Sequence, residues 1–260
     1  MKENKIWNDY LPEDMQEHWT VYECLKESED SSTFLVKETA TGILCVLKWG
    51  RNRQTEFLRN EMEIMKKMAD RKLSGIPKAY RIFEENGEVY LVREYIEGMS
   101  LAQMVLQKGG ISEAEICRIS RKICQTAEQF QNPDEPMIHR DIKPENIVVT
   151  PGGEVVFIDF GTMRSYKKDG SHDTFVVGTR GTAAPEQYGY TQTDQRTDVY
   201  AIGQTMLYMV SESYEMNQLS ECAVSRRMKK IIEKACSFEP DKRYGAVSYT
   251  HLRAHETLSD

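Results

Sequence analysis

HRDIKPENIVVTPGGEVVFIDFG, residues 139–161, contains two short apolar runs on either side of a Pro-Gly-Gly turn, a pattern typical of a β-hairpin. Folding the chain at this turn would bring Asn146 and Asp159 to the same open end of the hairpin. An amide oxygen and a carboxylate that converge there would suit Mg²⁺ that also holds substrate phosphates. Asp141 lies on the same loop as Asn146 and could reach a substrate hydroxyl, and Lys143 could neutralise charge on a transferring phosphoryl group.

The composition is that of an ordinary globular protein. The chain has 260 residues, 40% of them hydrophobic, and a net charge of 34 − 41 = −7 with both signs well mixed. This balance favours solubility and gives no general reason to expect nucleic acid as a partner. The longest apolar stretch, 199–210, is too short to span a bilayer, and the N-terminus lacks the apolar segment of a signal peptide. We therefore expect a cytoplasmic location without membrane contact.

The cysteines fit the same expectation. Six of them are scattered without a Cys-x-x-Cys pair. Cys117 and Cys124 fall on the apolar face of a predicted helix, where reduced thiols in the core are the simpler interpretation. This usage is typical of a reducing compartment.

The pattern of apolar residues divides the chain into a strand-rich part and a helix-rich part. Apolar and polar residues alternate in most of the chain up to a turn at Glu85-Asn-Gly87 and the strand after it. After Gly98, apolar residues recur mainly at helical spacing. The predicted elements are strands within 19–49, a helix at 54–68, strands at 79–83 and 89–94, and helices at 112–130 and 199–210. The sequence therefore predicts an α+β fold, in which a small β-rich region with one helix precedes a larger, mostly α-helical region.

The helix predicted at 54–68 carries a carboxylate on its apolar face. Glu61 lies four residues after Phe57 and four before Met65. A buried carboxylate without a partner is costly, and Lys48, on a strand of the same region, is the natural cation. A solvated Glu61 at the edge of the stripe is the alternative. The inward stripe is predicted to comprise Phe57, Leu58, Ile64, Met65 and Met68.

These features resemble the protein kinases in order and spacing across about residues 19–245. The lysine two residues after Asp141 resembles the Ser/Thr class, and Pro-Glu-Gln-Tyr at 185–188 is similar to bacterial kinases of the eukaryotic type. The resemblance implies a two-lobed protein kinase fold. It rests on Lys48, Glu61, His139–Asn146, Asp159–Gly161, Ala184-Pro-Glu186, Asp198 and Arg243.

The resemblance also sets the expected domain bounds. Residues 1–18 form an N-terminal lead, 19–97 the N-lobe and 98–246 a truncated C-lobe. VSYTHLRAHET, residues 247–257, back-translates into a sequence that resembles the transposon-end adapter of sequencing libraries, although a genuine polar helix is the alternative. We interpret 247–260 as a tail that is not native to the protein. Related bacterial kinases often carry a membrane helix downstream, so the parent protein could be anchored to a membrane.

The resemblance assigns catalytic and binding roles, and it implies ATP and Mg²⁺, or Mn²⁺ in its place, as cofactors. Asp141 would accept the proton of the substrate hydroxyl, with Lys143 beside it. Lys48, held by Glu61, would grip the α- and β-phosphates. The residues expected to bind nucleotide are Lys48, Ser28, Ser31, Val46, Glu94, Ile96, Asn146 and Asp159, the last two as metal ligands.

Other residues are expected to support or regulate the site. Asp198 would brace the catalytic loop, and Glu186 would form an ion pair with Arg243. A phosphate on Thr174 could pair with Arg140 and order the loop, although an unmodified loop is an equally good interpretation. The supporting residues are His139, Phe160, Gly161, Glu186, Asp198 and Arg243, and those assigned to regulation are Arg140, Ser171, Thr174 and Thr179.

Two departures from the family pattern bear on nucleotide binding. The positions of the phosphate-binding glycines hold Lys26, Ser28 and Ser31, and the acidic residues among them are Glu27, Glu29 and Asp30. Serine can still offer N–H and hydroxyl donors, but carboxylates repel a triphosphate unless they point to solvent. Arg93 precedes the hinge residue Glu94, where the family usually has an uncharged side chain, and it could narrow the adenine pocket or reach an acidic neighbour. Val46 narrows the pocket slightly more. We expect weak ATP affinity.

Three functions are compatible with these residues. The first is an active Ser/Thr protein kinase that acts on protein hydroxyls, its own activation loop included, with a homodimer for phosphorylation in trans. The second is a weakly catalytic pseudokinase that binds or scaffolds, which the glycine-free turn and Arg93 favour. The third is a small-molecule phosphotransferase of similar fold, which Lys143 and the Ala-Pro-Glu segment disfavour.

Overall fold

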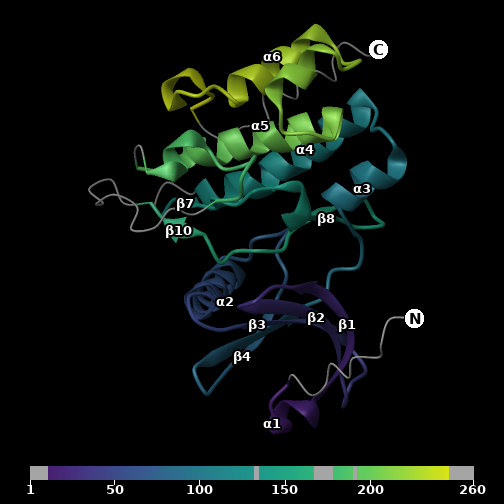
Figure 1. Cartoon of the computed structure of the whole chain (residues 1–260), viewed down its shortest axis with the longest axis vertical. Coiled ribbons are helices and arrows are strands. Elements are labelled where there is room, and N and C mark those ends of the chain that lie inside the picture. The colour runs from purple at the N-terminus through teal and green to yellow at the C-terminus, as the bar shows by residue number, and fades with distance from the viewer. Residues whose placement is uncertain (1–10, 132–134, 167–177, 190–191, 246–260) are drawn as a thin grey trace. The chain divides into compact units, whose positions relative to one another are not determined.

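The chain divides into two compact units, Met1–Ile96 and Glu97–Asp260. The computed structural model describes residues 11–131, 135–166, 178–189 and 192–245 (Figure 1). The predicted α+β fold is confirmed, because the first unit is built on a β-sheet and the second on α-helices.

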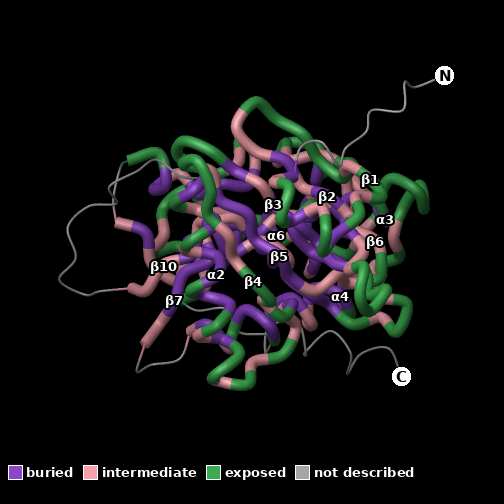
Figure 2. Tube along the Cα trace, turned by 90° about the horizontal axis from the view of Figure 1, so that it is seen from below, coloured by how far each residue is buried: buried purple, intermediate pink, exposed green. Residues whose placement is uncertain are grey.

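The first unit contains a five-stranded antiparallel sheet with the strand order β1-β2-β3-β5-β4. Its strands are β1 (Trp19–Glu27), β2 (Ser31–Glu38), β3 (Leu44–Gly50), β4 (Ala79–Glu85) and β5 (Glu88–Glu94). The predicted turn between β4 and β5 is present, with Asn86 and Gly87 both left-handed at φ 49° and 80°. Such a pair matches the twist of the flanking strands. The interior of β5 is buried throughout (Figure 2).

Helix α2 (Gln54–Asp70) packs on the sheet through Leu58 and Met62, which contact Val89 and Leu91 of β5. Leu58, Ile64, Met65 and Met68 of the predicted stripe are buried, and Phe57 is half-buried. Met62 is also buried, because a helix on a sheet buries a face wider than one strict stripe.

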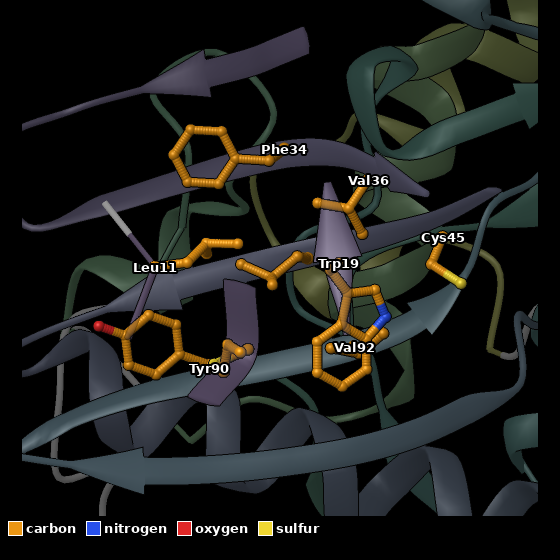
Figure 3. Packing of buried hydrophobic residues seen from close by; sticks show 9 residues of the cluster. Leu11, Trp19, Phe34, Val36, Cys45, Tyr90 and Val92 are labelled. Atoms are coloured by element: carbon orange, nitrogen blue, oxygen red, sulfur yellow. The ribbon is translucent and has the colours of Figure 1, made fainter. Parts of the chain in front are cut away.

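The N-terminal lead contributes to the core of the first unit. Helix α1 (Glu13–Gln16) and the residue before it, Pro12, follow Leu11, and both Leu11 and Met15 are buried. They join Trp19 in a cluster with side chains from β2, β3 and β5 (Figure 3). Residues 11–16 therefore cover apolar side chains of the sheet that would otherwise face water.

The second unit is mostly α-helical. Its helices are α3 (Leu101–Lys108), α4 (Glu113–Glu128), α5 (Gln195–Ser211) and α6 (Arg226–Ala235), with 3-10 turns at Gln129–Gln131, Pro144–Asn146, Pro185–Tyr188, Met216–Ser220 and Pro240–Lys242. Two small sheets complete it, β6 (Met99–Ser100) with β8 (Ile147–Val149) and β9 (Val155–Phe157), and β7 (Met137–Ile138) with β10 (Arg164–Ser165).

Capping residues set where these helices begin. Ser112 and Ser225 accept hydrogen bonds from the backbone N–H groups of the first turns of α4 and α6. Asp194 caps α5, which therefore begins four residues before the predicted start at 199. Helix α4 ends at Glu128, two residues before the predicted end, and continues as a 3-10 turn.

Helices α5 and α6 approach closely at Gly203. A Cβ atom on this residue would lie 2.7 Å from Cβ of Ala235 and 2.7 Å from Sγ of Cys236. Glycine is tolerated inside α5, despite its low helix propensity, because only glycine fits there without displacing α6.

Candidate active site

The hairpin of β8 and β9 positions two of the predicted site residues. Val148 and Val156 are paired in register, and the N–H of Ile158 donates to the carbonyl of Asn146 at 3.0 Å. Asp159 is the next residue, so the backbone places it at the same end of the hairpin as Asn146, as the Pro-Gly-Gly turn predicts. Oδ1 of Asp159 accepts from the N–H of Gly161 at 3.2 Å.

Asp141 lies at the centre of a hydrogen-bonded cluster. Its Oδ2 accepts from Nζ of Lys143 at 2.7 Å and from Nδ2 of Asn146 at 2.9 Å, and its Oδ1 accepts from the hydroxyl of Thr179 at 2.7 Å. Nζ of Lys143 also donates to Oγ1 of Thr179 at 2.6 Å. With side-chain exposures of 12% for Asp141 and 14% for Lys143, the pair is only partly screened by water.

Thr179 therefore lies in the cluster around Asp141, whereas the family resemblance assigned it to regulation. Its position is fixed by a turn, in which the N–H groups of Thr182 and Ala183 donate to its carbonyl at 3.1 and 2.9 Å. No local pattern distinguishes it from Thr182, so this contact was not predictable. Ser171 and Thr174, the other expected acceptors, lie outside the described residues.

Asp198, on α5, holds the loop that carries Asp141. Its two carboxylate oxygens accept from the backbone N–H groups of His139 at 2.9 Å and Arg140 at 3.0 Å. Burial raises the pKa of Asp198 to about 6, although these two N–H groups oppose the rise. The contacts agree with the bracing role inferred for this residue.

His139 is enclosed by aromatic rings. Its ring centroid lies 5.3 Å from that of Phe157, 5.5 Å from that of Phe160 and 6.1 Å from that of Phe130. Burial lowers the pKa of His139 to about 4, and the negative charges of Asp141 and Asp159 offset only part of this effect. The imidazole is consequently neutral at pH 7 and acts as part of the core.

Arg140 adopts a left-handed backbone, with φ 67°. This conformation costs a residue other than glycine roughly 1–2 kcal/mol, so neighbouring contacts must hold it. Its Nε donates to the carbonyl of Thr162 at 2.7 Å, and its own carbonyl accepts from Nε2 of Gln187 at 2.7 Å. The guanidinium expected to receive a phosphate thus already donates to the backbone of the segment that follows Gly161.

Glu186 and Arg243 form a buried, bidentate ion pair. Nη1 and Nη2 of Arg243 donate to the two carboxylate oxygens at 2.7 and 2.8 Å, and both side chains are almost wholly buried. The hydroxyl of Thr197 donates to Glu186 at 2.9 Å, and Arg243 also donates to the carbonyl of Phe238 at 2.9 Å. The expected pairing is present.

In the first unit, Lys48 and Glu61 are paired. Nζ of Lys48 lies 2.7 Å from Oε2 and 2.9 Å from Oε1 of Glu61, which is 1% exposed. The solvated alternative for Glu61 is therefore wrong. Leu91 of β5 lies opposite Lys48 in the sheet, so Lys48 has an apolar residue as its neighbour on the next strand.

Arg93 lies on the same strand and is 3% exposed. It pairs in register with Val46 of β3, and its Nη1 donates to the carbonyl of Glu94 at 3.0 Å. Glu94 and Ile96 are half-buried, and Glu94 Oε2 accepts from the N–H of Lys78 at 2.9 Å. A charged side chain thus occupies the interior beside Val46, as the sequence suggests.

The glycine-free turn between β1 and β2 is closed by its serines. The N–H and the hydroxyl of Ser28 both donate to the carbonyl of Ser31, at 2.8 and 2.9 Å. Oδ1 of Asp30 accepts from Nε of Arg51 at 3.1 Å and from Nδ2 of Asn52 at 2.9 Å. The Asp30 carboxylate is thus matched by donors from the loop after β3. Ser31 is the first residue of β2, so of the three positions at which the family has glycine it lies on the strand that follows the turn.

The donor set at the hairpin suits a hard divalent cation. Asn146 uses Nδ2 for its bond to Asp141, which leaves Oδ1 as the atom for a metal, and Asp159 supplies a carboxylate. Within the described parts of the chain, no group of three or more His, Cys, Asp and Glu side chains is arranged for a metal ion. Two protein oxygens can hold Mg²⁺ when phosphate oxygens and water molecules complete its coordination shell.

In the described ranges, no helix is both long enough and apolar enough to cross a membrane.

Comparison with known proteins places the chain in a family. Residues 20–256 match the protein kinase domain. The chain is 29% identical to serine/threonine-protein kinase D of Synechocystis sp. over 258 residues, which cover 87% of this chain and 50% of that protein. It is 25% identical to 3-phosphoinositide-dependent protein kinase 1 of Arabidopsis thaliana over 259 residues, covering 86% of this chain and 52% of that protein.

A probable serine/threonine-protein kinase of Clostridium perfringens is 35% identical over 147 residues, which cover 56% of this chain and 21% of the relative. The chain thus spans about half the length, or less, of these curated relatives. The family match extends over far more than half of the chain. The chain belongs to the protein kinase family.

Proposed function

We propose that the protein is a Ser/Thr protein kinase that transfers the γ-phosphoryl group of ATP to protein hydroxyls, including hydroxyls of its own activation loop. The observation that carries this proposal is the cluster at Asp141, where a carboxylate, an ammonium and a hydroxyl lie within hydrogen-bond distance of one another. The hydroxyl of a substrate serine or threonine would bind where it can donate a hydrogen bond to the Asp141 carboxylate.

The chemistry follows from the charges of these groups. Asp141 accepts the proton of the substrate hydroxyl as its oxygen bonds to the γ-phosphorus and the bond from that phosphorus to the bridging oxygen of ADP breaks. Lys143 stabilises the negative charge of the transferring group. Mg²⁺, or Mn²⁺, bound by Asn146 and Asp159 would neutralise phosphate charge. Lys48, fixed by Glu61, orients the α- and β-phosphates.

A weakly catalytic binding protein is the second candidate. The buried Arg93 and the glycine-free turn favour it, since both would weaken nucleotide binding. The intact set of Lys48, Asp141, Asn146 and Asp159 favours the kinase. The two functions differ in one measurable property, which is phosphate transfer by a folded protein.

The deciding experiment is transfer of radiolabelled phosphate from Mg·ATP to the protein and to a basic protein substrate. We expect label in the wild type and a loss of at least about 100-fold in Asp141→Asn, because the substrate proton then has no acceptor. Lys48→Met, which removes the cation paired with Glu61, should also lose label, and Lys37→Met, at a half-buried lysine of β2, is its control. Absence of label from folded wild type would favour the binding protein.

If the rate of self-labelling per molecule rises with protein concentration, phosphorylation occurs in trans between two copies.

A further inference from the structure

The side chain of Gln187 joins the Ala-Pro-Glu segment to the catalytic loop. Its Nε2 donates to the carbonyl of Arg140 at 2.7 Å, and its Oε1 accepts from the N–H of Ala184 at 2.9 Å. Gln187 is 5% exposed, so these bonds form where water competes little.

The carbonyl that Gln187 binds belongs to the peptide bond between Arg140 and Asp141. Arg140 is held in its left-handed conformation at other points as well, since its N–H donates to Asp198 and its Nε to the carbonyl of Thr162. The Gln187 amide adds a contact on the side of Arg140 next to Asp141. Loss of this contact would leave the Asp141 carboxylate bonded to Lys143, Asn146 and Thr179 but attached to a less firmly held peptide, so its orientation would become less well defined.

The chain leaves space for the Gln187 amide at Gly178. A Cβ on Gly178 would lie 3.0 Å from Nε2 of Gln187 and 2.5 Å from Cβ of Ala183, and the φ of Gly178 is 148°. Glycine is therefore required at 178 for two reasons, the backbone conformation and the close approach of the amide.

We propose that Gln187 is a positioning residue, which makes the orientation of Asp141 depend on the folded state of the segment from Gly178 to Gln187. This inference rests on the proposed function, in which Asp141 is the proton acceptor. Thr179, at the start of the segment, hydrogen-bonds Asp141 directly, so the segment contacts the catalytic loop on both sides of the Arg140–Asp141 peptide.

Gln187→Glu is the most informative variant. The new carboxylate would still accept from the N–H of Ala184 but could not donate to the carbonyl of Arg140. Burial raises the pKa of a carboxyl group, and once protonated the group can again donate. Gln187→Met has a similar length without either polar atom. Gln218→Glu makes the same change at an exposed site in the same unit and is the control.

The test combines kinetics with hydrogen exchange of the peptide covering residues 139–146. At pH 8 we expect Gln187→Glu to lower kcat about tenfold, with KM for ATP within about twofold of wild type, because a buried carbonyl has lost its donor. Relative to wild type at the same pH, the protection factor of the peptide should fall about tenfold at pH 8 and recover at pH 5. The comparison is made at each pH because Asp198, whose pKa is raised to about 6, accepts from two N–H groups of this peptide in both proteins. A defect that merely loosened the fold would not recover on acidification.

Gln187→Met should show the pH 8 loss at both pH values, and it replaces Gln187→Glu if that variant does not fold. Wild-type kcat and protection in Gln187→Glu, equal to those of Gln218→Glu, would overturn the inference. If the wild type transfers no phosphate, the proposed function fails, and the exchange measurement alone decides whether Gln187 holds the loop.

Discussion

At the scale of single residues, His139 and Asp198 are two buried groups whose titrations change the stability of the fold in opposite directions. Burial lowers the pKa of His139 from 6.5 to about 4, so between these values the unfolded chain binds more protons and acid destabilises the fold. Burial raises the pKa of Asp198 from 3.8 to about 6, so in that window the folded chain binds more protons. The contribution of Asp198 is therefore lost as the pH rises, and the two effects nearly cancel.

Replacing His139 should expose the titration of Asp198. His139→Phe keeps an aromatic ring among Phe130, Phe157 and Phe160 but removes the ionisable group. Titration of His139 lowers the free energy of unfolding of wild type by about 3 kcal/mol between pH 6.5 and pH 4, because one pKa unit corresponds to about 1.4 kcal/mol. The free energy of unfolding of His139→Phe, taken relative to wild type, should therefore be about 3 kcal/mol higher at pH 4 than at pH 6.5. Urea unfolding followed by far-UV circular dichroism measures this difference. An unchanged pH dependence would contradict it.

The residue scale also shows what a sequence can and cannot predict about the site. The Lys48–Glu61 pair was predictable because a carboxylate on an apolar helical stripe needs a cation from a neighbouring element. Thr179 and Gln187 were not placed in this way, because each acquires its partner from a loop 38 or more residues away, with no periodicity to indicate it.

At the scale of elements, the contact between α5 and α6 allows a direct test. Gly203→Ala would normally stabilise a helix by about 1 kcal/mol. Here the added Cβ would overlap Ala235 and Cys236, so we expect a net loss of about 1–3 kcal/mol in the free energy of unfolding. Gly203→Ala combined with Ala235→Gly should recover part of this loss. Stabilisation by Gly203→Ala alone, measured by urea unfolding, would show that the helices are not in close contact.

The turn between β1 and β2 can be tested through the exposed ion pair of Asp30 and Arg51. Arg51→Ala would remove the guanidinium beside Asp30 and leave its carboxylate near the proposed phosphate site. KM for ATP should rise about two- to fivefold, because exposed pairs contribute less than about 1 kcal/mol. Asp30→Ala in the same chain should restore KM, since the repulsion then disappears. If the double variant kept the raised KM of Arg51→Ala, the conformation of the turn and not the charge of Asp30 would determine KM for ATP.

Element types were predictable where a periodic pattern and a turn agreed. The β4–β5 and β8–β9 hairpins were found because Asn-Gly and Pro-Gly-Gly interrupt alternating or apolar runs. Element ends were predicted less well. The start of α5 depends on the Asp194 cap, whose side chain accepts from the N–H of Arg196, and such a bond leaves no periodic trace.

At the scale of the whole molecule, the two units can be observed separately during unfolding. The chain has 3 tryptophans, Trp7, Trp19 and Trp49, and all belong to the first unit, so tryptophan fluorescence reports on that unit. The longer helices belong mostly to the second unit and dominate circular dichroism. Two-state behaviour would make the two signals coincide.

Arg243→Met should destabilise the second unit by about 3–5 kcal/mol, because it leaves the Glu186 carboxylate buried without its cation. Since each unit has its own core, we expect the midpoint seen by circular dichroism to fall more than the midpoint seen by fluorescence. Arg59→Met, which breaks the exposed Arg59–Glu84 pair, should cost less than about 1 kcal/mol. Equal losses in the two variants would contradict the distinction between buried and exposed pairs.

The burial of Leu11 and Met15 affects where the folded domain can be cut. The family match begins at residue 20, yet these two side chains pack with Trp19 in the first core cluster. A chain shortened to that boundary would present part of this cluster to water as an apolar patch. Such a fragment should aggregate during expression and refolding, whereas one that begins before Leu11 should remain monodisperse.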